Sequence, residues 1–211
     1  MLDNLNLFNL AFLILPVLLA LTGHEFAHAW AAHRLGDDTA KLAGRLSLNP
    51  LVHLDVLGTL FLLISQLFGW AKPVPINPRN FKRPTRDLAL VSLAGPALNI
   101  ALALVIGLFL RLAFLAGLFN NLSPQALMLL RVLNLLVLVN FVLGCFNLLP
   151  LPPLDGFQFL ATFLPPGWVG FLADKRYHLI FFIIFIILAY LGVFGRLISF
   201  LVILQYRLIY S

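Results

Sequence analysis

The sequence predicts an all-α membrane protein that crosses the bilayer several times, and two observations support this prediction. Of the 211 residues, 62% are hydrophobic and 10% are charged, whereas soluble domains carry roughly 45–50% apolar and about 25% charged residues. The apolar residues also gather in long runs, and inside a bilayer only helices and closed barrels satisfy every backbone polar group. We therefore expect a single domain over residues 1–211, with about four to six transmembrane or re-entrant helices.

The apolar runs that predict these helices are long enough for a bilayer, since about 20 helical residues cross its hydrocarbon core. The first run ends in Arg34-Leu35-Gly36, and glycine commonly follows the last residue of a helix. The runs are 7–34, 51–70, 88–118, 126–149 and 178–206. The second of these is barely long enough to cross.

Two polar connections separate the earlier runs. Residues 37–49 mix polar residues with glycine, and we expect a short β-hairpin or an extended segment near 39–49. Residues 71–87 contain prolines at positions 73, 75, 78 and 84. Because proline lacks a backbone N–H and disfavours helical geometry in the residue before it, this connection is predicted to be extended.

The basic residues predict the orientation of the chain. Lysines and arginines follow the first run, fill the connection 71–87 and precede the last run, whereas segments 1–6 and 119–125 contain none. The positive-inside rule then places the N-terminus outside and the three basic segments in the cytoplasm. Segments 34–50 and 71–87 can share that side only if residues 51–70 re-enter the bilayer or lie along its surface.

The charge and cysteine content limit the classes of partner. Lysine and arginine outnumber aspartate and glutamate by 14 to 8, and the basic residues lie in loops, where they suit anionic lipid. No basic patch interleaved with aromatic residues indicates nucleic acid. The single cysteine, Cys145, excludes an internal disulfide. The expected environment is the lipid bilayer.

The pattern His24-Glu25-Phe26-Ala27-His28 lies inside the first apolar run. Residues four apart share one face of a helix, so His24 and His28 can offer two imidazole nitrogens to one zinc ion, with Glu25 beside them as general base. Three ionisable groups within one turn are costly in an apolar helix unless function requires them. The alternative is polar packing between helices.

A catalytic zinc usually has three protein ligands and one open position, so the two histidines need a partner. Asp155 is the best candidate, because it follows a proline-rich turn after a run that returns to the cytoplasmic side. His24 lies near the same side, about ten residues or roughly 15 Å of helix before Arg34. Asp155 could instead cap a short helix. His53 with Asp55 is a competing source of the ligand, although we favour a second-shell, substrate-binding or interfacial role for them.

Taken in order along the chain, these residues resemble the site-two protease family of intramembrane zinc metalloproteases. The resemblance covers residues 20–160, and the chain looks like a compact prokaryotic form. The matching motifs are His24–His28, then Gly44–Pro50 with His53 and Asp55, then Lys72–Pro75, then Ala94–Pro96 with Asn99, and finally Asn147–Pro150 and Leu154–Gly156.

The resemblance implies roles for several residues. His24, His28 and Asp155 would bind zinc, Glu25 would be the catalytic base, and Asn147 would help to position or polarise the scissile peptide. Asn99 joins His53 and Asp55 as a candidate second-shell or substrate-binding residue. The implied substrates are single-span membrane proteins that are cut within or near their transmembrane helix. The implied location is the plasma membrane, with the active site near its cytoplasmic face.

Two other functions fit an apolar chain with buried ionisable groups. A metal transporter would spread its acidic and histidine residues along several helices, whereas these residues gather at one depth. A catalytically silent membrane scaffold would be indicated by the loss of Glu25 or of a ligand, and none is lost. The sequence therefore favours a zinc-dependent intramembrane endopeptidase.

Overall fold

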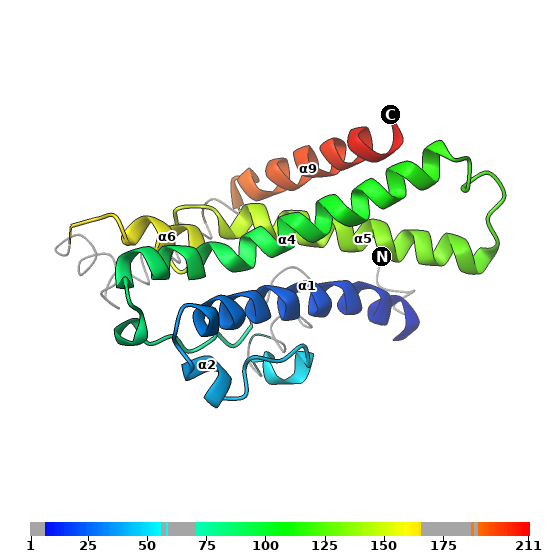
Figure 1. Ribbon diagram of the computed structural model, residues 1–211. Coiled ribbons are helices and arrows are strands. Elements are labelled where there is room, and N and C mark those ends of the chain that lie inside the picture. The colour runs from blue at the N-terminus through cyan, green and yellow to red at the C-terminus, as the bar shows by residue number, and fades with distance from the viewer. Residues whose placement is uncertain (1–6, 56–57, 59–70, 166–186, 188–189) are drawn as a thin grey trace.

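The computed structural model describes residues 7–55, 58, 71–165, 187 and 190–211, and the secondary structure of these residues is helical (Figure 1). Two long helices, α4 and α5, form an antiparallel pair joined by a short turn. The helices are α1 (Leu7–Arg34), α2 (Thr39–Leu42), α4 (Pro84–Leu115), α5 (Pro124–Asn147), α6 (Asp155–Ala161) and α9 (Val193–Tyr210), with 3-10 turns η1 (Pro50–Val52) and η2 (Pro78–Asn80). In the described part of the chain the β structure is limited to a single antiparallel bridge between Leu54 and Ala71.

Helix α4 packs against most of the other helices. It contacts α1, α5, α6 and α9, and α5 also contacts α1 and α9. Figure 1 shows α1 on one side of the α4–α5 pair and α9 on the other. This arrangement brings segments that are distant in sequence, α1 and α6, to the same end of α4.

The all-α prediction is confirmed for the described residues, and α1 has the predicted bounds. The β-hairpin expected near 39–49 is not confirmed, because residues 39–42 form α2. The carboxylate of Asp37 explains this difference: its Oδ1 accepts the Thr39 backbone N–H at 3.1 Å and the Thr39 hydroxyl at 2.5 Å. Such local bonds turn the chain into a helix rather than a strand.

The number of membrane crossings is confirmed only in part. Judged by length and composition, α4 and α5 are the two helices of the described residues that can cross a membrane. Only 22% and 11% of their most apolar stretches are buried within the protein, so these surfaces suit contact with lipid rather than with water. The predicted re-entry of residues 51–70 falls mostly on residues 56–57 and 59–70, which lie outside the described residues, as do residues 178–186 and 188–189 of the last apolar run.

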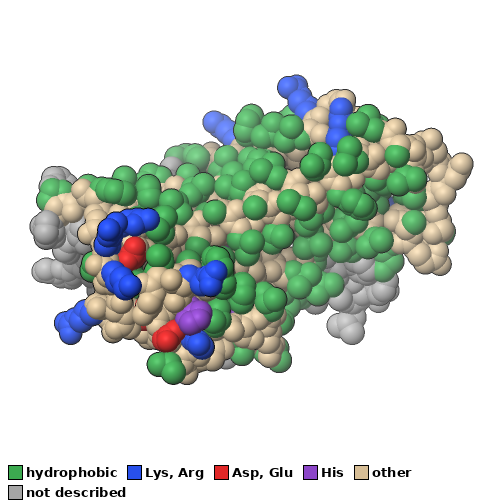
Figure 2. Space-filling model, in the orientation of Figure 1, with side chains coloured by type: hydrophobic (Ala, Val, Ile, Leu, Met, Phe, Trp, Pro, Cys, Tyr) green, Lys and Arg blue, Asp and Glu red, His purple; other side chains and the backbone are tan. Residues whose placement is uncertain are grey.

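Charged and apolar side chains occupy different parts of the surface. Figure 2 shows hydrophobic side chains over the length of the helices, whereas most charged side chains of this face cover α2 and the adjoining connection, with a smaller basic group over α9. The charged end is the end of α1 that carries His24 and His28.

Candidate metal centre between helices α1 and α6

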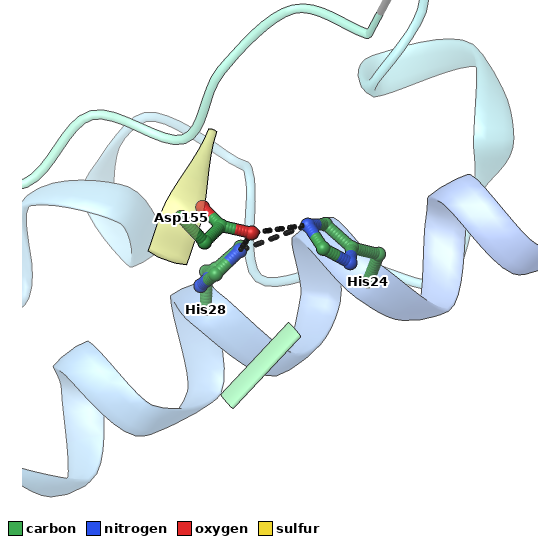
Figure 3. A group of neighbouring side chains, drawn as sticks. All are labelled: His24, His28 and Asp155. Carbon is green, nitrogen blue, oxygen red and sulfur yellow. Dashed lines mark hydrogen bonds and ion pairs between the residues drawn. The ribbon is translucent and has the colours of Figure 1, made fainter. Parts of the chain in front are cut away.

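Three side chains converge at this end of the molecule. His24 and His28 lie one turn apart on α1, and Asp155 is the first residue of α6 (Figure 3). The Nε2 atoms of the two histidines are 3.1 Å apart, and Asp155 Oδ2 lies 3.0 Å from that of His24 and 3.3 Å from that of His28. Among the described residues these three form the one group of potential ligands whose atoms lie within 4.8 Å of one another.

A tight turn after α5 delivers Asp155 to this position. Gly156 packs directly onto the end of α5, since a Cβ added to it would lie 2.2 Å from the carbonyl oxygen of Leu148. No larger residue fits beside Asp155 in this backbone. The alternative role of Asp155 as a helix cap finds no support here, because α6 has Leu154 at its N-cap and no side-chain cap hydrogen bond.

Hydrogen bonds on the far side of each imidazole determine which nitrogen carries the proton. His24 Nδ1 lies 2.7 Å from Asn99 Oδ1, and His28 Nδ1 lies 2.7 Å from the carbonyl oxygen of Val91. Both partners are acceptors, so each Nδ1 donates, and each Nε2 of a neutral imidazole is left with its lone pair. Two imidazoliums with their Nε2 atoms 3.1 Å apart would repel each other strongly.

The chemistry of these atoms fits a metal ion. Three electron-pair donors face one another with no hydrogen between them, and Asp155 Oδ2 is buried without a hydrogen-bond partner. A cation bound by all three resolves this arrangement. Two imidazole nitrogens and one carboxylate oxygen are a usual ligand set of catalytic zinc, and a second hydrogen bond that orients each imidazole is typical of such sites.

Helix α4 approaches the two imidazoles so closely that only glycine fits. A Cβ added to Gly95 would lie 2.4 Å from His28 Nε2 and 2.7 Å from His24 Cε1. The Ala94–Pro96 motif belongs to the resemblance described above, but no role for Gly95 could be predicted from the sequence. The available signal was a glycine next to a proline inside an apolar helix, which is unfavourable there unless packing requires it.

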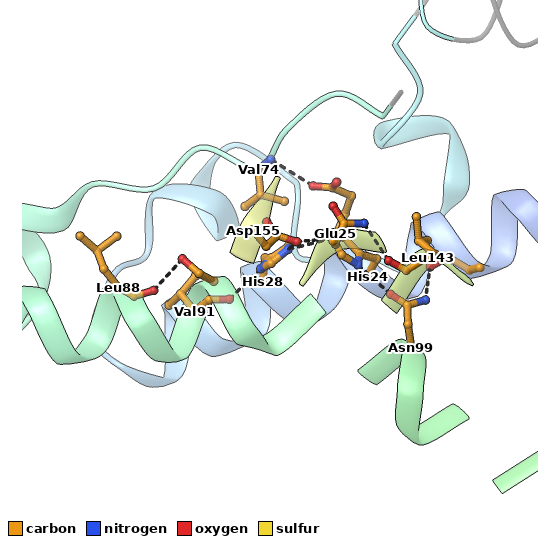
Figure 4. A network of polar contacts seen from close by, with 12 residues as sticks. His24, Glu25, His28, Val74, Leu88, Val91, Asn99, Leu143 and Asp155 are labelled. Atoms are coloured by element: carbon orange, nitrogen blue, oxygen red, sulfur yellow. Dashed lines mark hydrogen bonds and ion pairs between the residues drawn. The ribbon is translucent and has the colours of Figure 1, made fainter. Parts of the chain in front are cut away.

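Glu25 lies beside this group and contacts a different segment. Its side chain is 9% exposed, and its Oε2 accepts the backbone N–H of Val74 at 3.2 Å (Figure 4). Since Pro73 and Pro75 have no N–H, Val74 supplies the one backbone donor of this three-residue stretch. Within the described residues no hydrogen bond involves the other carboxylate oxygen, Oε1.

Two buried charged residues hold the proline-rich segment 71–80 next to Glu25. Arg45 donates hydrogen bonds to the carbonyl oxygens of Lys72 and Pro73, the latter at 3.1 Å. Asp37 accepts the backbone N–H of Asn77 and the side-chain amide of Asn80, both at 2.7 Å. Val74, whose backbone N–H donates to Glu25, therefore lies between the residues bound by Arg45 and those bound by Asp37.

The structure brings Asn99 to the site and leaves the other candidates outside the ligand group. His53 is buried and bonds through Nε2 to the carbonyl oxygen of Ser47 at 2.8 Å. Asp55 Oδ1 accepts the backbone N–H of Gly58 at 2.8 Å. Asn147 lies at the end of α5, where its amide donates to the carbonyl oxygen of Leu143 at 3.0 Å. No hydrogen bond joins these three residues to the histidines or to Asp155 in the described structure.

Comparison with known proteins adds independent information. The family model of peptidase family M50 matches residues 12–191. The chain is 44% identical over 156 residues to "Putative zinc metalloprotease YwhC" of Bacillus subtilis, an alignment that covers 74% of this chain and 70% of that protein. It is 31% identical over 175 residues to "Putative zinc metalloprotease Rip2" of Mycobacterium tuberculosis, with 82% of this chain and 64% of that protein covered.

A second Rip2 protein, from Mycolicibacterium smegmatis, is 33% identical over 162 residues, with 75% of this chain and 60% of that protein covered. The chain thus spans less than two thirds of the length of the Rip2 proteins. No solved structure matches it significantly.

Proposed function

This chain belongs to peptidase family M50 and is a zinc-dependent metallopeptidase, and we propose that it cuts single-span membrane proteins within or near their transmembrane helix. The observation that carries the proposal is the convergence of His24, His28 and Asp155 on one point, between helices whose outer surfaces are apolar. A peptide bond that is cut at this point therefore comes from a chain in the bilayer or at its boundary with water.

Each residue of the site has a proposed role. His24, His28 and Asp155 hold the zinc, which when bound supplies a Lewis acid and lowers the pKa of water. Glu25 takes a proton from the attacking water through Oε1 and delivers it to the leaving amine. The Val74 N–H holds the other carboxylate oxygen of Glu25 in place. Asn147 is proposed to assist at the scissile carbonyl, where one such donor contributes roughly 3 kcal/mol.

Two segments, around 39–49 and 72–78, are candidates for receiving the unwound substrate by strand addition, and 72–78 is the better one. Ala71 already pairs with Leu54 in an antiparallel bridge, and the Lys72 N–H donates to the carbonyl oxygen of His53 at 2.8 Å. An extended backbone of this kind can add a further strand from a substrate. The other candidate segment, 39–49, begins with a helix. We propose that the substrate lies along segment 72–78, next to Glu25.

We also propose that the protein is a multi-pass plasma-membrane protein with its active site near the cytoplasmic face. The exposed basic side chains of the connection before α4 lie at the same end as the metal centre, as the positive-inside rule favours. They are Lys72, Arg79, Lys82 and Arg83, and Arg86 adds a further exposed basic side chain in the first turn of α4.

The alternative functions gain no support from the site. A transporter needs polar groups along a path, whereas the potential metal ligands of the described residues form one cluster. A silent scaffold is disfavoured because the ligands and Glu25 are all present.

The test of the proposed mechanism is Glu25→Gln, which keeps the shape of the side chain and removes the base. The purified variant should keep its zinc and lose about 10²–10⁴-fold in the rate of cutting a model transmembrane substrate. His24→Ala, His28→Ala and Asp155→Ala should instead lose most of the zinc, as measured by metal analysis. Asp38→Asn, at an exposed carboxylate that pairs with His33, is the matched control and should cut normally. Cutting by Glu25→Gln at the wild-type rate would disprove the mechanism.

A further inference from the structure

Two asparagines of α5 use their side chains in the same way, in different parts of the molecule. The amide of Asn134 donates to the carbonyl oxygen of Leu130, and the amide of Asn140 donates to that of Leu136, both at 2.9 Å. Each bond ties the amide nitrogen to its own helix. The amide oxygen is therefore turned toward a neighbouring helix, where it can only accept.

The oxygen of Asn140 begins a hydrogen-bonded chain that ends on His24. Asn99 on α4 donates through Nδ2 to Asn140 Oδ1 at 2.8 Å and to the carbonyl oxygen of Ala20 at 3.2 Å. Its own oxygen accepts the Nδ1 proton of His24 at 2.7 Å, as Figure 4 shows for Asn99 and His24. Asn140, Asn99 and His24 are 2%, 0% and 4% exposed, so water does not replace any of these bonds.

The direction of these hydrogen bonds depends on the orientation of the Asn99 amide, because a rotation of that amide by half a turn exchanges its oxygen and its NH₂ group. If Asn99 were reversed, its NH₂ would face His24 Nδ1, which would then have to accept, and the proton of the neutral ring would move to Nε2. A protonated Nε2 cannot bind a metal ion. Asn140 and the carbonyl oxygen of Ala20 both oppose the reversal, because each accepts from the NH₂ of Asn99 and would repel the oxygen of a reversed Asn99; the bond to Asn140 is the shorter, 2.8 Å against 3.2 Å.

We propose that Asn140 is a positioning residue of the metal centre, which together with the Ala20 carbonyl oxygen fixes the orientation of the Asn99 amide and thereby keeps the proton of His24 on Nδ1 and the lone pair on Nε2. The inference rests on the proposed role of His24 as a zinc ligand. With Asn140 included, the residues that support the metal centre come from α1, α4 and α5.

His28 needs no second side chain to fix the position of its proton. Its Nδ1 donates to the carbonyl oxygen of Val91, which belongs to the backbone of α4 and cannot present a donor. The two ligands on α1 are thus oriented by different means: the proton of His28 is fixed by an oxygen that is always an acceptor, and that of His24 by a side chain that needs a partner. Asn140 should therefore matter for His24 alone.

The experiment compares zinc affinity in the purified full chain, measured by competition with a chelator. Asn140→Leu should weaken zinc binding about 10–100-fold, the usual effect of removing a partner that orients a ligand. Asn140→Asp still offers an acceptor to Asn99 and should stay close to wild type. Asn134→Leu removes the same kind of bond on the same helix, away from the metal centre, and should leave the zinc affinity unchanged.

A second measurement reads the proton position directly, first in the wild-type protein. In metal-free wild-type protein labelled with ¹⁵N-histidine, the nitrogen chemical shifts of His24, identified by their absence in His24→Ala, should show the proton on Nδ1. In Asn140→Leu they should shift toward the form with the proton on Nε2.

Several outcomes would overturn the inference. These are wild-type zinc affinity in a folded Asn140→Leu variant, an equal loss of affinity in Asn134→Leu, or an Nε2 proton on His24 in the wild-type protein. If His24→Ala loses zinc while Asn140→Leu binds it normally, this inference alone is wrong. If His24→Ala also keeps its zinc, the proposed ligand set is wrong as well.

Discussion

Asn134 and Asn140, both in the interior of α5, build interhelical polar networks on the α9 side and the α1 side of the helix, and these networks differ in how they end. Near α9, Asn134 Oδ1 accepts the hydroxyl of Tyr210 at 2.9 Å, and the amide of Gln205 donates to the Asn134 carbonyl oxygen at 3.0 Å. Every bond there joins a protein donor to a protein acceptor. Near α1, the chain from Asn140 ends on three acceptor atoms that face one another with no donor. Only the second network needs a cation to be complete.

The two networks also differ in the size of the side chains that pack around them. The α9 region is built from large apolar and aromatic residues, with Leu110, Val137 and Ile209 buried together. An open pocket of about 280 Å³ lies beside it, lined in part by Asn134, Gln205 and Tyr210. In the metal region the buried hydrophobic residues of α1 are alanines, and Gly95 of α4 lies against both imidazoles, which allows the helix backbones to approach closely.

The largest effect expected from this difference concerns two glycines of α4. A Cβ on Gly95 would lie 2.4 Å from His28 Nε2, whereas a Cβ on Gly107 would meet Ile209 and Val137 at 3.9 Å, an ordinary contact. Gly95→Ala should displace both imidazoles and abolish zinc binding and cleavage. Gly107→Ala should fold and cleave normally, since alanine is the better helix former by roughly 1 kcal/mol. Metal analysis and a cleavage assay decide the matter, and full zinc content in Gly95→Ala would show that the helices are not so closely fitted.

The part of the site that could be predicted from the sequence follows from local rules. His24 and His28 share a helix face because of the helical repeat, and Asp155 is set apart by its proline-rich turn and by the cost of a lone carboxylate in apolar surroundings. Gly95 and Asn140 could not be identified in this way, because their roles depend on which faces of three helices meet. An asparagine in an apolar helix signals a polar partner, and the sequence does not say which one.

The hairpin prediction failed for a similar reason. The side chain that organises residues 37–42 is Asp37, and two of its partners, Asn77 and Asn80, lie about 40 residues away in the chain. Burial by itself would raise the pKa of Asp37, but the hydrogen bonds from Thr39, Asn77 and Asn80 lower it below its usual value. A single carboxylate thus joins α2 to the segment that reaches Glu25, and no local pattern reveals this.

The lowered pKa of Asp37 predicts an intermediate effect that is confined to the metal region. A carboxylate whose pKa is lower in the folded protein stabilises that protein above its unfolded pKa of about 3.9, and this contribution is lost as the pH falls through the folded value. Hydrogen-exchange protection of segment 71–80 should therefore decrease below about pH 4, while that of α9 changes less. Asp37→Asn should already reduce this protection at neutral pH and remove much of its dependence on acid. The control is Asp38→Asn, and a parallel loss of protection in both regions would contradict the prediction.

The smallest effect is expected in the α9 network, where a hydrogen bond can be removed without leaving a charge or a ligand in need of a partner. Tyr210→Phe removes the hydroxyl that donates to Asn134 Oδ1, while the amide of Gln205 stays within 3.4 Å of the same oxygen. Hydrogen bonds between helices in a membrane contribute about 0.6 kcal/mol on average, so the free energy of unfolding should fall by about that amount. Zinc affinity should remain that of the wild type, because no bond of this network reaches Asn99 or His24. Unfolding in mixed detergent, combined with chelator competition, measures both quantities. A drop in zinc affinity in Tyr210→Phe would show that the two networks of α5 are coupled, and would contradict the division between them.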